Sequence, residues 1–180
     1  LIYANPHVRA KIRTLLGDEA HIESYVAIIS LPGSKTQHRQ RDCQILCDER
    51  LDLFLPPHAL TLVIPLIEMN AQHGSTAFWP GTHLPTASSG EDSEPIVPTV
   101  AVGSCALWDY RIKHGGTPNI SSTPRPILYI SYSKSWFRDT KNYRNKHQRR
   151  LSFKPDFLDS LTDEHKTLFS HVILPDATLI

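Results

Sequence analysis

The chain has 180 residues, of which 40% are hydrophobic and 21% are charged, and its formal net charge is +1. This length suits one domain with a full hydrophobic core. The near-neutral charge gives no electrostatic reason to expect a nucleic-acid or membrane-surface protein. Apolar runs such as YVAIIS at 25–30 are far shorter than the ~20 residues that cross a bilayer. We therefore expect a soluble globular domain spanning 1–180.

Two features bear on cellular location without fixing it. The three cysteines are Cys43, Cys47 and Cys105, an odd number with no dense framework. This favours a reducing compartment, which includes the matrix or stroma of an organelle. The chain begins at Leu1 rather than methionine, so it is a fragment, a processed chain or one whose first residues are missing.

The first predicted element is a short amphipathic helix over 6–17. Pro6 suits the first helical position, and apolar residues at 8, 12, 15 and 16 share one face. Gly17 is the expected stop. A strand follows at 21–30 and is ended by Pro32 and Gly33. We expect 35–42 to be a strand whose polar face lines a cavity.

Further strands are expected along the rest of the chain, at 59–69, at 77–83, as two short pieces around Gly103, and at 125–136. Between them, 84–95 is a polar loop and a candidate lid. A closing helix over 159–170 would be capped by Asp159 or Ser160. Many short strands with turn signals, framed by helices, predict a mainly β antiparallel sandwich or barrel with flanking helices.

The predicted core covers about residues 20–137, and a basic extension covers 138–180. Within that extension, 138–150 holds six Lys or Arg against one Asp. Such a run is typically a solvated surface segment, and the alternative is a patch for nucleic acid or an acidic partner.

Among ten histidines, one stands apart by its context. His114 follows a buried strand and precedes a glycine pair that lets the backbone approach a ligand closely. Eleven residues later, Arg125 opens the last β-rich run. Five other histidines lie in helical or terminal segments and are predicted to be at the surface: His7, His21, His147, His165 and His171.

Three stretches in this order carry a resemblance to a known family. They are PGSKTQ followed by an aspartate, ALTLVIPL followed by HGSTAFWPGTHL, and GSCALWDYRIKHGGTPNIS followed by RPILYISYSKSWF. Together they resemble the phytanoyl-CoA dioxygenase family over roughly residues 8–142. The resemblance implies a double-stranded β-helix core of the jelly-roll or cupin-like kind, and iron(II) with 2-oxoglutarate as cofactors.

Carried onto this sequence, the resemblance makes Asp42 the carboxylate ligand of iron and His114 the distal histidine. Arg125 would bind the distal carboxylate of 2-oxoglutarate with two parallel hydrogen bonds, a geometry that lysine cannot copy. Gln37 falls where the family has a residue lining the 2-oxoglutarate site. The family's two histidines and one carboxylate hold iron on one side and leave positions open for the co-substrate and oxygen. The resemblance implies no catalytic residue beyond these metal ligands.

The departure from the family is Gln40. The family has His-x-Asp where this chain has Gln40-Arg41-Asp42. An amide oxygen is a weaker ligand for iron(II) than an imidazole, so the metal site is expected to be weakened. His38 is the alternative third ligand, since 38, 40 and 42 face one side of a strand, but it lies about 6.6 Å further along and needs a bulge to reach.

Two functions remain open. One is an oxygenase that hydroxylates a small or lipid-like substrate, with apolar walls from Phe78, Trp79, Trp108 and Tyr110, which otherwise serve as core. The other is an inactive relative acting as an interaction subunit of a larger assembly, docked through 138–150. A cupin-like sugar or acid binder is disfavoured, because the chain has no His-x-His cluster.

Overall fold

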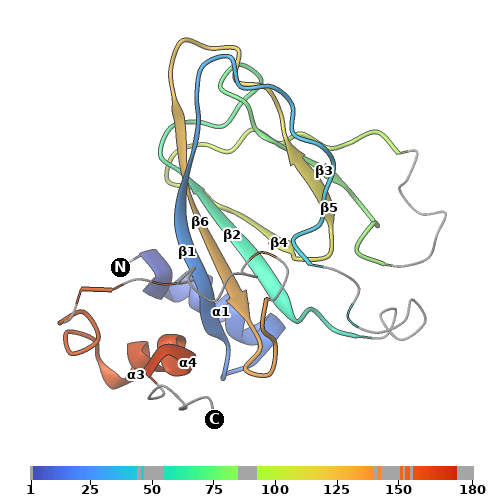
Figure 1. Ribbon diagram of the computed structural model, residues 1–180. Coiled ribbons are helices and arrows are strands. Elements are labelled where there is room, and N and C mark those ends of the chain that lie inside the picture. The colour runs from blue at the N-terminus through green and yellow to red at the C-terminus, as the bar shows by residue number, and fades with distance from the viewer. Residues whose placement is uncertain are drawn as a thin grey trace.

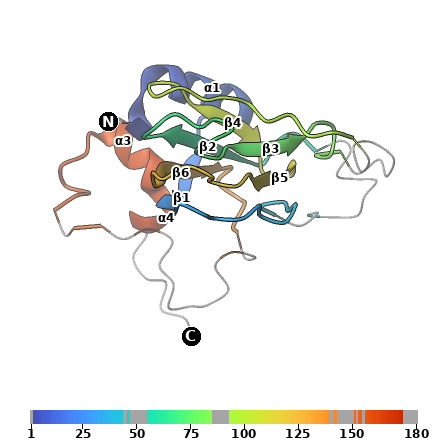
Figure 2. The same ribbon diagram turned by 90° about the horizontal axis from the view of Figure 1, so that it is seen from above.

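In the part of the chain that the structure describes, six strands in two antiparallel sheets form the core (Figures 1 and 2). The computed structural model describes residues 2–43, 46, 55–84, 93–139, 142, 151, 153–154 and 156–173. The larger sheet has the order β1-β6-β2-β4 and the smaller pairs β3 with β5. Their bounds are β1 (His21–Ser30), β2 (Ala59–Pro65), β3 (Thr76–Trp79), β4 (Ala106–Asp109), β5 (Lys113–Gly116) and β6 (Arg125–Ser133).

The predicted mainly β antiparallel architecture is confirmed. β1 begins and ends where the sequence predicts, and β6 begins at Arg125 as expected. β5 is not among the predicted strands, since a glycine pair such as 115–116 is unusual inside a strand. Of the two strands expected around Gly103, only β4 forms, while Ile96 and Val100 make single bridges.

One face of the larger sheet lines a cavity, and the other packs in an apolar cluster. On β6, residues 125, 127, 129 and 131 line a cavity, whereas Ile130 and Tyr132 are fully buried on the opposite face. This alternation is the period of two that a strand imposes. Fully burying a side chain such as Ile130 stabilises the fold by about 1.5–3 kcal/mol relative to exposure.

The opposite face is covered by helices. After a 3-10 turn η1 (Ile2–Ala4), helix α1 (Pro6–Leu16) places Ile12 and Leu16 in the same apolar cluster as Ile130 and Tyr132. Asn5 caps α1, because its side-chain oxygen accepts hydrogen bonds from the backbone N–H groups of residues 7 and 8. The helix ends at Gly17, as predicted, with a positive φ of 94°.

The C-terminal segment completes this cover. It contains α3 (Asp163–Lys166), η2 (Thr167–Phe169) and α4 (Ser170–Ile173), and Leu168 and Phe169 join the cluster that α1 packs against. Both views place these helices away from β3 and β5 (Figures 1 and 2). The predicted helix over 159–170 therefore begins late and is broken. Thr162, rather than Asp159 or Ser160, is the cap of α3.

A β-bulge interrupts the pairing of β1 with β6. Ile22 pairs with Tyr132 and Ser24 with Ser131, so Glu23 is the extra residue. The bulge changes which face each side chain reaches. Ile22 packs in the cluster under α1, while Ser24 lines the cavity on the other face.

Some expectations fall on residues outside the described ranges. They are Cys47, the larger part of the candidate lid at 84–95 and most of the basic run at 138–150. Among the residues that are described, no helix is both long enough and apolar enough to cross a membrane.

Candidate active site

A cavity of about 250 Å³ lies on the inner face of the larger sheet. Strands β1 and β6 supply one wall, and Val63, Thr76 and Trp108 contribute from other strands. Five of the residues predicted from the sequence line it together: Gln37, Gln40, Asp42, His114 and Arg125. The fold therefore gathers side chains that lie far apart in the sequence, from Gln37 to Arg125.

His114 and Asp42 face each other across the cavity. The Nε2 atom of His114 lies 3.6 Å from Oδ1 of Asp42, and both side chains are largely buried. Nδ1 of the ring lies 3.0 Å from the carbonyl oxygen of Ile112. A carbonyl can only accept, so Nδ1 is the donor of this contact, and Nε2 is the ring atom that faces Asp42. Two electron-pair donors facing each other at this separation are suited to a shared cation.

Asp42 is held by two hydroxyl groups. Thr61 Oγ1 donates to Asp42 Oδ2 at 2.9 Å, and the Tyr129 hydroxyl donates to the same oxygen at 2.7 Å. Oδ1 is the oxygen that faces His114. The two hydroxyls therefore fix the carboxylate so that one oxygen is satisfied by the protein and the other faces the cavity.

Gln40 occupies the position opposite His114. Their backbones exchange two hydrogen bonds, each 2.9 Å long, in an antiparallel bridge. Residues paired in this way carry their side chains on the same face of the sheet. Segment 37–40 thus extends the smaller sheet beyond β5, which explains why Gln40 lines the cavity although the expected strand over 35–42 is reduced to one bridge.

His38 is placed differently. The residue is exposed and is absent from the cavity lining, within the part of the chain that the structure describes. The bend that would bring it to Asp42 does not occur. The structure therefore gives no support to His38 as the alternative third ligand.

Arg125 is a buried cation at the cavity wall. The residue is only 6% exposed, and among the described residues neither Nε nor Nη1 has a hydrogen-bond partner. Burial lowers the pKa of this guanidinium, because the charged form loses its hydration. Arginine nevertheless stays charged at neutral pH. A buried charge of this kind is suited to an anionic ligand that can accept two parallel hydrogen bonds.

Gln37 and the glycine pair meet on the edge of β5. The Gly116 N–H donates to Gln37 Oε1 at 3.0 Å, and the Gln37 N–H donates to the Gly116 carbonyl at 2.9 Å. A Cβ atom on Gly116 would lie 2.9 Å from Gln37 Oε1, and one on Gly115 would lie 3.3 Å from the His38 carbonyl oxygen. The absence of side chains at these glycines lets segment 37–40 approach β5.

The four aromatic residues proposed as walls divide into two pairs. Trp108 and Tyr110 line the cavity. Phe78 packs edge-on against Trp108 with ring centroids 5.0 Å apart, while Trp79 is covered by the guanidinium of Arg39 at 5.3 Å. The latter pair therefore packs behind the wall or outside it.

Tyr110 is also bound by hydrogen bonds. Its hydroxyl lies 3.1 Å from Ser131 Oγ and 3.2 Å from Asp139 Oδ2, and its single proton can be donated to the carboxylate. Burial, and then the charge of Asp42, raise the pKa of Tyr110 well above its ordinary value. The phenol therefore stays protonated and acts as a donor.

Sequence reasoning missed Thr61, Tyr129, Ser131 and Asn142. Asn142 lines the cavity, and its side-chain amide donates to the Asp42 carbonyl at 2.8 Å. A signal for two of them was present, because counting in steps of two from Arg125 along a strand leads to Tyr129 and Ser131. No comparable signal marks Thr61 or Asn142.

The residues at the Asp42 end fit a divalent metal with one weak ligand. A carboxylate and an imidazole are already oriented, and the third position offers an amide oxygen. The residues at the Arg125 end fit a carboxylate. Together they could hold a metal and an anionic chelator side by side, a combination suited to metal-assisted redox chemistry on a third molecule.

Comparison with known sequences finds a family model and curated relatives. A family model described as "Phytanoyl-CoA dioxygenase (PhyH)" matches residues 4–127, a range that includes all five of the residues gathered at the cavity. The protein "Dioxygenase af480" from Aspergillus fumigatus is 25% identical over 181 residues, which cover 97% of this chain and 57% of that protein. The chain thus spans little more than half the length of this curated relative.

Comparison with solved structures gives the fold. The non-heme alpha ketoglutarate dependent epimerase SnoN from nogalamycin biosynthesis superposes with a TM-score of 0.64 at 17% identity, over 84% of this chain and 65% of that one. SnoN in complex with Fe3+, alpha ketoglutarate and nogalamycin RO gives 0.60 at 16% identity, over 84% and 67%. Together with the two antiparallel sheets, this likeness confirms the predicted double-stranded β-helix.

Proposed function

The chain belongs to the phytanoyl-CoA dioxygenase family, and from that premise we propose that it is an iron(II)- and 2-oxoglutarate-dependent oxygenase that hydroxylates a small or lipid-like molecule. The observation that carries this proposal is the buried guanidinium of Arg125, whose Nε and Nη1 have no hydrogen-bond partner among the described residues and which lines the same cavity as Asp42 and His114. An isolated buried charge is unfavourable, and its retention is explained by a ligand that neutralises it.

Arg125 has the role of binding the distal carboxylate of 2-oxoglutarate. Gln37 lines the same cavity and contributes to this subsite. Trp108 supports an anionic ligand as well, since its buried indole Nε1 has no hydrogen-bond partner among the described residues. The Arg125 guanidinium and the Trp108 indole N–H can only donate hydrogen bonds, which suits a dicarboxylate ligand.

Asp42 and His114 have the role of metal ligands, and Gln40 supplies the third position through its amide oxygen. Iron(II) bound there would supply activation of oxygen coupled to oxidative decarboxylation of 2-oxoglutarate. The protein residues orient the ligands. Thr61 and Tyr129 hold Asp42, and the Ile112 carbonyl fixes the tautomer of His114.

The substrate would enter the remaining space of the cavity. Apolar side chains of Val26, Ile28 and Ile127 and polar groups of Ser24 and Ser131 line it. A volume of about 250 Å³ leaves little room beyond 2-oxoglutarate. We therefore propose that only the reacting part of a small or lipid-like substrate enters the cavity.

Succinate formation from 2-oxoglutarate tests this function without knowledge of the substrate. Protein supplied with iron(II), oxygen and labelled 2-oxoglutarate is expected to release succinate slowly. His114→Ala and Arg125→Met are expected to abolish this release, while His7→Ala, at an exposed position in α1, leaves it unchanged. If all three variants match the background of free iron(II), and so does the unmodified protein, the chain is an inactive relative and the interaction-subunit hypothesis takes precedence.

A further inference from the structure

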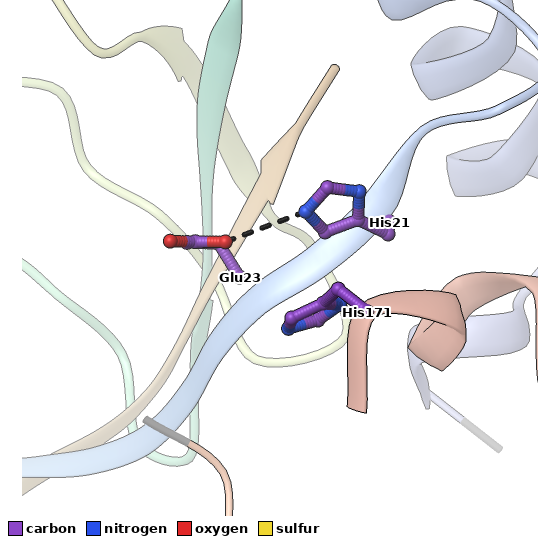
Figure 3. A group of neighbouring side chains, drawn as sticks. All are labelled: His21, Glu23 and His171. Atoms are coloured by element: carbon purple, nitrogen blue, oxygen red, sulfur yellow. Dashed lines mark hydrogen bonds and ion pairs between the residues drawn. The ribbon is translucent and has the colours of Figure 1, made fainter. Parts of the chain in front are cut away.

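A second group of metal-ligating side chains lies outside the cavity. His21 and Glu23 come from β1 and His171 comes from α4, and we name these three residues the β1–α4 cluster (Figure 3). Each contributes a ligand atom, and these atoms all lie within 4.8 Å of one another. His21 and Glu23 are each 1% exposed. His21 was predicted to be at the surface, and that prediction is wrong.

The bulge in β1 creates this arrangement. Glu23 is the residue inserted opposite the pairing of Ile22 and Ser24. A bulge turns the inserted side chain away from its regular alternation, and here the carboxylate lies beside the ring of His21 (Figure 3). β1 is an edge strand of its sheet, and His171 reaches it from the helical segment that follows the core-packed Phe169.

The contacts of the cluster define its chemistry. Glu23 Oε2 lies 3.4 Å from His21 Nε2, and Glu23 Oε1 accepts a hydrogen bond from the backbone N–H of Asp139 at 2.9 Å. Ser133 Oγ lies 3.1 Å from the same Nε2 atom. The rings of His21 and His171 pack with centroids 4.3 Å apart.

One cation already touches the cluster. Arg138 Nη1 lies 2.9 Å from His21 Nε2 and also donates to the carbonyls of Ser135 and Phe137. A guanidinium has no lone pair to offer, so Nε2 of His21 is the acceptor and carries a lone pair in this state. Arg138 is exposed as a whole residue, so its side chain can turn into solvent and release that lone pair.

We propose that the β1–α4 cluster binds one zinc-like divalent cation through His21, Glu23 and His171, with Arg138 displaced on binding. Two imidazoles and one carboxylate form a common donor set for Zn²⁺. Zinc ligands lie about 2.0–2.1 Å from the metal in tetrahedral geometry, so two of them are about 3.3–3.4 Å apart. Side-chain rotations that shorten the widest separation by up to about 1.5 Å would complete the site.

The cation would fasten the C-terminal segment to the edge of the larger sheet. η2 and α4 follow one another in the chain, and η2 packs against β1. Binding to the folded state only would stabilise that attachment by mass action. This role is independent of the proposed oxygenase, because no member of the β1–α4 cluster lines the cavity.

Zinc binding must be measured where the cavity cannot contribute. The parent for this test is the full chain carrying Asp42→Ala and His114→Ala. We expect it to retain one Zn²⁺ per chain after gel filtration, and to give an intense visible spectrum with Co²⁺. Adding His171→Ala should lower the affinity at least tenfold, while adding His7→Ala should not change it.

Arg138→Gln provides a test that misfolding cannot imitate. Removing the competing cation should raise zinc affinity severalfold, whereas a purely structural Arg138 would give no gain. Since His21 is fully buried, Glu23→Gln serves as the conservative partner of His171→Ala and should also weaken binding. A parent that binds no zinc, or a His171→Ala variant that binds as tightly as the parent, would overturn the proposal.

Discussion

The two ends of the cavity differ in how many residues set up each proposed binding site. At the Arg125 end, a single residue supplies the charge, and no other described residue satisfies its Nε and Nη1 atoms. At the Asp42 end, the ligands are oriented by neighbours, and the backbone bridge to His114 fixes the position of residue 40. The comparison teaches that position and chemical identity are separate. The fold places residue 40 opposite His114, and the side chain that the sequence puts there is an amide.

Replacing Arg125 gives the largest expected effect, because it is the one Lys or Arg among the described residues that line the cavity. Hydrogen bonds to charged groups contribute about 1.5–3 kcal/mol each, so Arg125→Met should weaken 2-oxoglutarate binding at least about 100-fold. The ligand-free protein should be no less stable, since an unpaired buried charge is removed. Calorimetric titration and thermal unfolding measure the two effects.

Arg125→Lys is the matched control, because it keeps the charge and loses the two parallel hydrogen bonds. Its affinity for 2-oxoglutarate should lie between those of the unmodified protein and Arg125→Met. Equal binding by all three proteins would mean that Arg125 does not contact the co-substrate.

Gln40→His addresses the other end directly. The backbone bridge already places residue 40 opposite His114, so an imidazole there should raise iron(II) affinity roughly 10–100-fold. Anaerobic competition with a chelating dye measures the gain. Gln40→Ala is the control and should bind iron(II) more weakly than the unmodified protein. No gain in Gln40→His would show that position 40 does not reach the metal.

Tyr129→Phe tests whether Asp42 depends on its neighbours. The variant keeps the ring and removes the hydroxyl that donates to Asp42 Oδ2 at 2.7 Å. Loss of such an orienting partner lowers metal affinity about tenfold. The same dye competition detects it, and unchanged affinity would contradict a positioning role. Circular dichroism controls for folding.

His38→Ala should have the smallest effect. The residue is exposed and lies outside the cavity lining, so iron(II) affinity should change less than about twofold. A loss comparable to that in His114→Ala would make His38 a ligand and would overturn the assignment of Gln40.

The sequence allowed the five cavity residues to be predicted because each lies in a stretch that carries the family resemblance. It did not reveal the hydrogen bonds around them. Thr61 and Tyr129 lie in β2 and β6, and only the pairing of these strands brings both hydroxyls to Asp42. His21 was misjudged for a related reason, because a bulge and a distant helix bury it. A pattern of neighbouring residues in the sequence predicts neither the hydroxyl contacts to Asp42 nor the burial of His21.

The most direct test of the central claim is an anaerobic titration of the protein with iron(II) and 2-oxoglutarate, followed by the weak visible charge-transfer band of the chelate. We expect the unmodified protein to give the band at high iron(II), Gln40→His to give it at lower iron(II), and Arg125→Met to lose it. Absence of the band in the unmodified protein, with its appearance in Gln40→His, would mean an intact scaffold whose chemistry has been given up. Absence in both proteins would contradict the assignment of the cavity itself.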